Sequence, residues 1–299
     1  MIVTKNLCKK FDDFTALTDV SCTIPQGCIY GMVGSNGAGK STFLRLLTGV
    51  YKQNSGEILI DGMPVYENSF IKSTITYVPD ELYFLQGASM NRMASFYKSI
   101  YKQFDRERYN ALTKAFGLDP KKALSTLSKG MKRQAAIILA LSCKPDYMFF
   151  DETFDGLDPV MRNLVKSLIC KDVIEHNATA IITSHSLREL EDICDQLSLL
   201  HKGGLVLESD IENLKTSQFK IQIAFNYDYT NDIFTDIDIH NFKKIGSVTN
   251  MIVKGDRKET VARLKKLDPV LLEVLPLTLE EVFTYEMESL GYKFDDILD

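Results

Sequence analysis

The sequence contains no tryptophan, and its 299 residues include only four histidines, six cysteines and eight prolines. The cysteines form no C-x-x-C pair and stand at no zinc-finger spacing from a histidine, which argues against a structural zinc site and favours reduced thiols. The longest run without a polar residue, 135–141, is far shorter than the roughly 20 apolar residues of a membrane-spanning helix. The N-terminus leads into polar sequence, so we expect no secretory signal and a cytoplasmic chain.

The sequence also lacks a large excess of either charge. It has 35 lysines and arginines against 40 aspartates and glutamates, which gives a net charge of -5. The whole acidic excess lies after Ser217, and the preceding part is balanced. Neither part has the basic surface typical of nucleic-acid binding, so we expect no nucleic-acid partner.

Strand-like and helix-like segments alternate along much of the chain. Short apolar runs are typical of buried parallel strands and lie at 28–33, 147–150, 178–183 and 196–200. Between about 81 and 142 the strand signals disappear, and helical patterns occupy 90–104, 106–116 and 131–141. The sequence therefore predicts an α/β fold with a helical subdomain at about 81–142.

A second domain is expected to begin at residue 217, after a polar stretch. From Phe219 to Phe225, apolar and other residues alternate as in a half-buried strand. Helical patterns at 261–267 and 279–290 flank a predicted strand at 270–275. The predicted organisation is one domain at 1–216 and a small accessory α/β domain at 217–299.

The strongest local signal is a glycine-rich loop between a predicted strand and a predicted helix. It fits the pattern G-x-x-x-x-G-K-[ST], whose glycines let backbone amides curl around a phosphate. The helix N-terminus adds roughly half a positive charge, Lys40 adds a mobile full charge, and the Ser41 hydroxyl is a hard oxygen ligand for Mg²⁺. We therefore expect phosphate binding by Gly34, Ser35, Asn36, Gly37, Ala38, Gly39, Lys40, Ser41 and Thr42.

A second signal is the pair of acids Asp151 and Glu152 at the end of a predicted apolar strand. In enzymes with this kind of phosphate loop, one acid binds the metal and another orients or deprotonates the attacking water. We assign the metal role to Asp151 and the base role to Glu152. The alternative is an ordinary pair of helix-capping acids in the next loop.

The segment LSKGMKRQ at 127–134, with the two motifs above, resembles the nucleotide-binding subunits of ABC transporters. In that family this segment of one subunit closes over the γ-phosphate held by another, which implies that Ser128 and Gly130 contact nucleotide. Ser128 is also a good N-cap, and a helix start attracts anions. The chain departs from the family pattern at Lys129 and Met131, where glycine and glutamine are usual.

Further landmarks of the family stand in the expected order. The resemblance implies that Asp158 contacts the opposite subunit, that His185 reaches the γ-phosphate, and that Phe11 stacks on adenine, with core packing as the alternative for Phe11. The segment YVPDE at 77–81 resembles the Q-loop, but Asp80 replaces the usual glutamine. A carboxylate is also a hard ligand, so Asp80 is expected to bind the metal.

The resemblance implies a P-loop NTPase fold, an ABC ATPase core at 1–216, with the accessory domain at 217–299. It implies ATP and Mg²⁺ as cofactors, and Glu152 and His185 as catalytic residues. The expected function is ATP hydrolysis that powers export of an antibiotic, drug or peptide. The ending at 278–283, TLEEVF, also resembles exporter-type subunits.

The implied partners are a separate transmembrane permease subunit, docked near Tyr83 and Phe84, and a second ATPase subunit, either a copy or a paralogue. The chain would then be peripheral to the inner face of the cell membrane. Two alternatives are a soluble ABC ATPase in translation, repair or cofactor assembly, and a nucleotide sensor without turnover. The presence of both Glu152 and His185 speaks against the sensor.

Overall fold

A computed structural model describes residues 1–211, 218–275 and 277–289. The chain separates into two compact units, Met1–Glu208 and Ser209–Asp299. The division falls within strand β10 (Gly204–Asp210). The boundary predicted between 216 and 217 lies outside the described residues.

The centre of the first unit is a six-stranded sheet in the order β10-β9-β3-β8-β7-β6. Neighbouring strands run parallel from β9 to β6. Every residue of β3, β7 and β8 is buried, as expected for strands covered on both faces. Bounds are β3 (Ile29–Val33), β6 (Ile75–Val78), β7 (Tyr147–Asp151), β8 (Thr179–Ser184) and β9 (Gln196–His201).

A second, antiparallel sheet in the same unit has the order β2-β1-β4-β5. Its strands are β1 (Ile2–Phe11), β2 (Phe14–Ile24), β4 (Ser55–Ile60) and β5 (Met63–Pro64). Helix α1 (Lys40–Leu47) packs between the sheets, because its residues Phe43 and Leu44 share one buried core with Leu7 of β1 and Phe149 of β7. The sequence analysis predicted α1 and missed this sheet.

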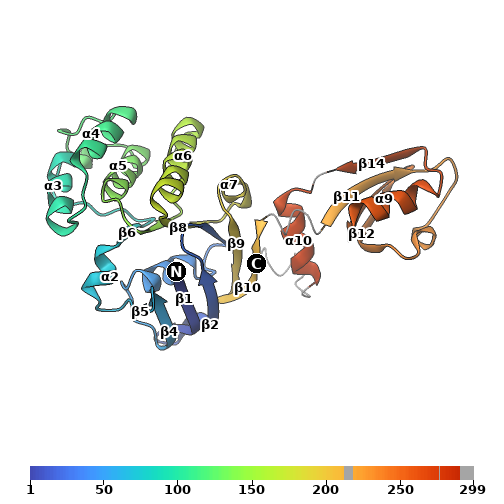
Figure 1. Cartoon of the computed structure of the whole chain (residues 1–299), viewed down its shortest axis with the longest axis horizontal. Helices are drawn as coiled ribbons and strands as arrows, with labels where there is room; N and C mark the ends of the chain where they lie inside the picture. Colours follow the sequence, from blue (N-terminus) through green and yellow to red (C-terminus); the bar gives the residue numbers. More distant parts are fainter. Residues whose placement is uncertain (212–217, 276, 290–299) are drawn as a thin grey trace. The chain divides into compact units, whose positions relative to one another are not determined.

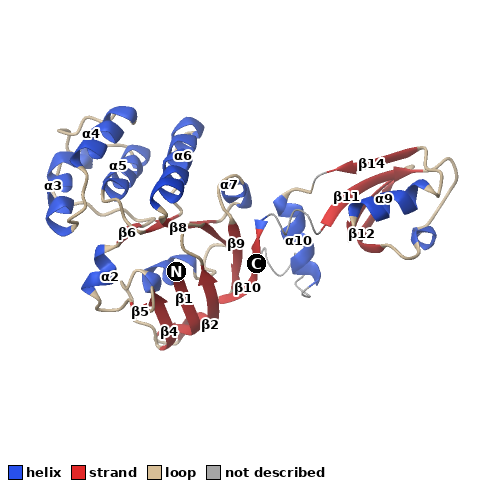
Figure 2. Ribbon diagram, viewed as in Figure 1, coloured by secondary structure: helices blue, strands red, loops and turns tan. Residues whose placement is uncertain are grey.

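Helices α3, α4, α5 and α6 lie away from the antiparallel sheet, as Figure 2 shows. Helices α3, α4 and α5 lie side by side in the region expected to be helical (Figure 1). Side chains of Ser89, Asp105, Ser128 and Asp158 cap the N-termini of α3, α4, α5 and α6. Helix bounds are α2 (Ser69–Ser73), α3 (Met90–Ile100), α4 (Arg106–Ala115), η1 (Leu124–Thr126), α5 (Lys129–Ser142), α6 (Pro159–His176) and α7 (Leu187–Glu191).

The second unit is built on an antiparallel sheet in the order β12-β13-β11-β14. Apolar side chains of β11, including Ile221 and Ile223, pack with Met251 and Val253 of β13 in a separate core. Its elements are β11 (Gln218–Ala224), η2 (Asn231–Phe234), β12 (Asp238–Ile245), β13 (Val248–Lys254), α9 (Arg257–Lys265), β14 (Leu271–Leu275) and α10 (Leu279–Ser289). In the part of the chain that the structure describes, no helix combines the length and apolar character that crossing a bilayer requires.

Candidate active site

The glycine-rich loop connects β3 to α1, as the sequence predicts. Gly37 and Gly39 have φ angles of 80° and 108°, in the left-handed region that favours glycine. A Cβ on Gly34 would lie 2.4 Å from the Leu200 carbonyl oxygen, and one on Gly39 would lie 2.8 Å from that of Ala16. Packing against the neighbouring backbone therefore requires glycine at both ends of the loop.

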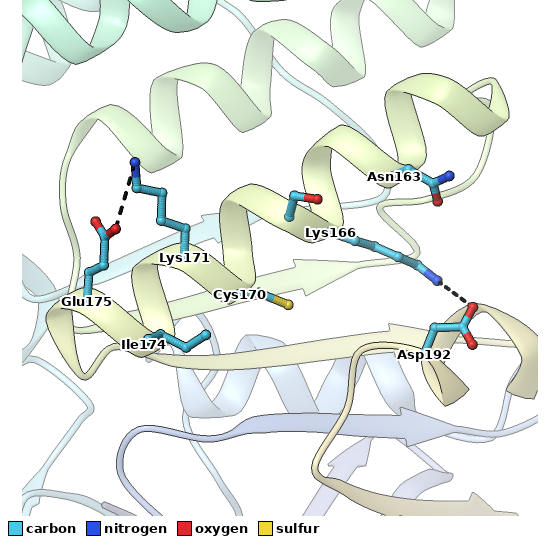
Figure 3. Close-up of a pocket in the computed structure, with 8 residues that line it drawn as sticks. Asn163, Lys166, Cys170, Lys171, Ile174, Glu175 and Asp192 are labelled. Carbon is cyan, nitrogen blue, oxygen red and sulfur yellow. Dashed lines mark ion pairs between the residues drawn. The ribbon is translucent and has the colours of Figure 1, made fainter.

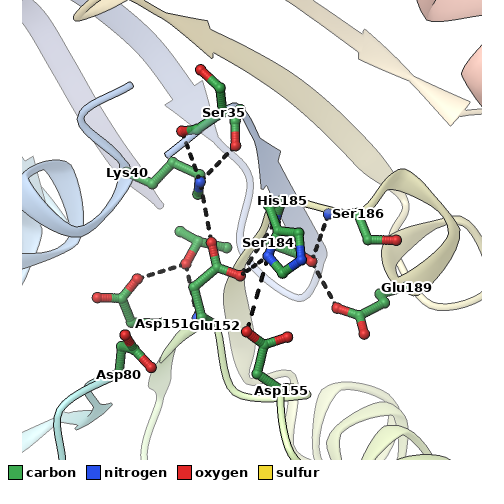
Figure 4. Close-up of polar contacts among 12 residues, drawn as sticks. Ser35, Lys40, Asp80, Asp151, Glu152, Asp155, Ser184, His185, Ser186 and Glu189 are labelled. Carbon is green, nitrogen blue, oxygen red and sulfur yellow. Dashed lines mark hydrogen bonds and ion pairs between the residues drawn. The ribbon is translucent and has the colours of Figure 1, made fainter. Parts of the chain in front are cut away.

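Lys40, at the start of α1, is buried and points back across the loop (Figure 4). Its Nζ donates hydrogen bonds to the carbonyl oxygens of Gly34, at 2.6 Å, and Ser35, at 3.2 Å. The same ammonium lies 3.1 Å from Oε1 of Glu152. The loop lysine and the expected base thus neutralise each other in this conformation.

Asp151 is fully buried at the end of β7 and collects three hydroxyl donors. Ser41 and Thr183 donate to its Oδ1 at 3.0 and 2.8 Å, and Tyr77 donates to its Oδ2 at 3.2 Å. Burial first, and then the charge of Asp151, raise the pKa of Tyr77, so its phenol remains a donor. The Ser41 hydroxyl and the Asp151 carboxylate form a set of hard oxygen atoms that fits Mg²⁺.

Glu152 and His185 meet at the ends of the adjacent strands β7 and β8. Oε2 of Glu152 accepts from the His185 backbone N–H at 3.2 Å and lies 3.0 Å from its ring Nδ1. This side-chain hydrogen bond, the largest cause, raises the pKa of His185 against an opposing effect of burial, and the carboxylates of Glu152 and Asp155 add to the increase. Glu152 has a φ of 47°, an uncommon conformation for a non-glycine residue that is typical of functional sites.

Asp80, which follows β6, has a partner that the sequence analysis did not single out. Its Oδ1 lies 2.9 Å from Nη2 of Arg133 on α5. The Arg133 side chain is 1% exposed and that of Asp80 is 47% exposed. The sequence does hold a signal for this pair, because Arg133 stands close to the apolar stretch 135–141. Arginine is almost never buried unless it is paired, so an acidic partner could have been expected.

The remaining predicted residues have local structural contacts. Ser128 caps α5 by accepting from the Met131 N–H at 3.3 Å, and Asp158 caps α6 by accepting from Val160 and Met161. A Cβ on Gly130 would lie 2.7 Å from the Gly156 carbonyl oxygen, so the first turn of α5 closely approaches the loop that contains Gly156.

Phe11 is 37% exposed, with its ring centroid 5.3 Å from that of Tyr51. Within residues 1–211, no hydrogen bond or ion pair joins Ser128, Asp158 or Phe11 to the group around Lys40. The structure therefore brings together Lys40, Ser41, Asp151, Glu152 and His185, with the Gly34 and Ser35 carbonyl groups bonded to Lys40, and leaves Ser128, Asp158 and Phe11 outside that contact network.

A separate hollow of about 590 Å³ lies along the outer side of α6 and contains none of the predicted site residues (Figure 3). Lys166 pairs loosely with Asp192 at 3.8 Å, and Lys171 with Glu175 at 3.9 Å. The two lysines of this hollow are thus already paired with carboxylates. The acids and hydroxyls that fit nucleotide chemistry lie instead at the strand ends.

A protein-family model described as ABC transporter matches residues 17–155. The chain is 32% identical to the ABC transporter ATP-binding protein YtrB of Bacillus subtilis (strain 168), over 95% of this chain and 97% of that protein. The chain belongs to the ATP-binding proteins of ABC transporters. It is therefore an ATP-binding ATPase of a family whose members dimerise and work with transmembrane components.

Two further similarities agree with this assignment. The chain is 30% identical to the probable multidrug ABC transporter ATP-binding protein YbhF of Escherichia coli (strain K12), over 72% of this chain and 38% of that protein. A solved ATP-binding subunit of an ABC transporter superposes with a TM-score of 0.67 at 22% identity, covering 72% of this chain and 92% of that one. The expected ABC ATPase fold is confirmed, and the soluble non-transport alternative is not favoured.

Proposed function

We propose that this chain is the ATP-hydrolysing subunit of an exporter. It acts on a separate transmembrane permease subunit from the cytoplasmic face of the membrane, together with a second ATPase subunit that is a copy or a paralogue. The observation that carries this proposal is the contact network of Lys40, Ser41, Asp151, Glu152 and His185.

The loop from Gly34 to Thr42 binds the phosphates of ATP. Its backbone amides and the N-terminus of α1 provide partial positive charge. Lys40 leaves the Gly34 and Ser35 carbonyl oxygens and binds the outer phosphates. The exposed ring of Phe11 stacks on adenine, a role that its 37% exposure permits.

Ser41 and Asp151 hold Mg²⁺, a role supported by the 3.0 Å contact between their oxygens. When bound, the metal neutralises charge on the phosphate oxygens. Tyr77 and Thr183 keep the Asp151 carboxylate oriented through their hydrogen bonds. Asp80 is the third ligand expected from the sequence, and its ion pair with Arg133 competes with that role.

Glu152 accepts a proton from the attacking water as that water approaches the γ-phosphate. Its carboxylate is first released from Lys40, because the lysine binds the phosphates when ATP enters. His185 holds Oε2 of Glu152 through the 3.0 Å contact and lies beside the position of the γ-phosphate. Positioning of the water, together with stabilisation of the charge on the transferred phosphoryl group, supplies most of the rate enhancement.

Ser128, Gly130 and Asp158 complete the site of the partner subunit. Ser128 stands exposed at the tip of α5, where the helix start attracts the phosphates of a nucleotide bound to the other protomer. Each of the two ATP sites then needs both subunits. This arrangement explains why these residues lie outside the contact network of the single chain.

The permease docks near Tyr83 and Phe84, in the segment between β6 and α3. Tyr83 is 83% exposed, so its ring is available for contact with a partner. Export is supported by similarity to YbhF, whose name includes multidrug, and by the exporter-like sequence at the start of α10.

Substitution of the base tests the hydrolytic mechanism. Glu152→Gln removes the proton acceptor and keeps the size of the side chain, so ATP turnover is expected to fall by about 10² to 10⁴ while ATP binding is retained. Glu175→Gln, an exposed acid of α6 (Figure 3), is the matched control. Phosphate release and nucleotide binding are measured on the full chain, and rapid turnover by Glu152→Gln would refute the assignment.

A further inference from the structure

Arg133 connects parts of the first unit that are distant in the sequence. It lies one turn into α5, the helix that Ser128 caps, and its side chain is buried. Nη2 donates to Oδ1 of Asp80 at 2.9 Å, and Nη1 donates to the carbonyl oxygens of Pro79 and Asp151, each at 3.4 Å. The guanidinium of Arg133 therefore links the ends of β6 and β7 to α5, the helix that Ser128 caps.

The three acceptors stand at the carboxyl ends of neighbouring parallel strands. Pro79 directly follows β6, and Asp151 is the last residue of β7, immediately before Glu152. Guanidinium is planar and rigid, so it fixes the spacing of the groups that it binds. A shift of Arg133 would move the Asp151 backbone and the carboxylate of Asp80 relative to each other.

Arg133 is not fully satisfied in this arrangement. Its Nε is buried and has no hydrogen-bond partner among the described residues. An unpaired buried donor is unfavourable, and the two carbonyl contacts at 3.4 Å are long. The guanidinium therefore leaves part of its hydrogen-bonding capacity unused in this arrangement.

We propose that Arg133 is a positioning residue for ATP hydrolysis, and that Asp80 acts through it. The pair fixes the end of β7, and with it Glu152, to the loop after β6, and it transmits the orientation of α5 to both. This proposal rests on the proposed function, in which Glu152 activates water and Ser128 reaches the partner's nucleotide. It assigns Asp80 to the ion pair and not to the metal.

A double-mutant cycle on the full chain tests the pairing. Asp80→Asn, Arg133→Gln and the double variant are compared with wild type by phosphate release. Each single change is expected to lower kcat about tenfold or more, because misplacement of catalytic groups by an ångström can cost about 10²-fold, with KM for ATP within about twofold. The double variant is expected to be no slower than the slower single variant. Losses that multiply in the double variant would overturn the pairing.

A metal readout separates positioning from ligation. Binding of a fluorescent ATP analogue is measured at increasing Mg²⁺ in wild type and Asp80→Asn. The half-saturating Mg²⁺ concentration is expected to be unchanged. A higher requirement in Asp80→Asn would assign Asp80 to the metal and overturn the proposal.

A conservative variant and a control distinguish loss of positioning from loss of the fold. Arg133→Lys keeps the charge but cannot reach three acceptors with one planar group, so it is expected to remain folded and still lose kcat. Full kcat in folded Arg133→Lys would contradict the positioning role. Arg92→Gln removes an exposed arginine of α3 and is expected to match wild type.

The activity of the wild type separates failure of the proposed function from failure of the proposal for Arg133. A folded wild-type chain that binds ATP but hydrolyses none contradicts the proposed function, and with it this proposal. Multiplying losses in an active enzyme overturn the pairing of Arg133 with Asp80 and leave the proposed function standing.

Discussion

The two units of the chain place their charges differently. In the first unit, Lys40, Arg133 and Asp151 are each no more than 5% exposed and contact one another or their neighbours at the strand ends. In the second unit, the pairs Glu259–Arg263 and Lys244–Asp228 each include a side chain at least 63% exposed. Burying a charged group costs free energy. The buried charges of the first unit therefore indicate that this unit carries the chemistry.

The apolar core of the second unit serves a different purpose. Ile221 and Met251 are fully buried and face each other across β11 and β13. Substitutions of these buried charged residues in the first unit should therefore change nucleotide binding or turnover, whereas core substitutions in the second should change stability first. The following predictions test that distinction.

The largest effect on ATP binding is expected from Lys40→Ala. The variant removes the ammonium that binds the phosphates and leaves the Glu152 carboxylate, whose side chain is 12% exposed, without its cation. A hydrogen bond to a charged group contributes about 1.5–3 kcal/mol, so the Kd for ATP should rise roughly 10- to 100-fold. Equilibrium binding of ATP measures this Kd, and Lys171→Ala, at an exposed position of α6, is the control. An unchanged Kd would remove Lys40 from the phosphate site.

A stability effect is expected from Ile221→Ala. The side chain is fully buried, and its truncation should cost about 2–5 kcal/mol in the free energy of unfolding of the second unit. Denaturant unfolding measures the loss, and ATP turnover of the first unit should persist. Ile174→Ala, at a position 81% exposed on α6, should change stability by no more than about 0.5 kcal/mol. Equal losses in both variants would contradict the assigned core.

The smallest effect is expected from His185→Gln as a function of pH. The contact with Glu152 raises the pKa of His185 above 6.5, so the folded state binds the proton more strongly than the unfolded state. The stabilisation that protonated His185 gives the folded state is full below pH 6.5 and is lost as the pH rises through the raised pKa. The stability difference between wild type and variant should thus shrink as the pH rises above 6.5 and through the raised pKa of His185. A pH-independent difference would contradict the ion pair.

Short motifs explain why much of the site could be predicted. The glycine-rich loop, the acids after β7 and the histidine after β8 each follow an apolar strand, and parallel strands bring their carboxyl ends to one edge of the sheet. Lys40, Asp151, Glu152 and His185 therefore meet as expected. Their individual roles in catalysis stay predictions.

The contacts missed by sequence analysis join residues that are far apart in the chain. Arg133 and Asp80 are separated by 53 positions, and Tyr77 and Asp151 by 74. Local periodicity carries no information about such pairs. The antiparallel strands β1, β2 and β12 were also missed, because exposed polar positions interrupt their apolar residues.

The most direct test of the central claim is the molar mass of Glu152→Gln in solution, measured by light scattering with and without ATP and Mg²⁺. If Ser128 of one subunit completes the site around Lys40 of the other, ATP converts the variant from monomer to dimer, and Ser128→Arg in the same background prevents the conversion. A Glu152→Gln chain that binds ATP and remains monomeric would contradict the shared site.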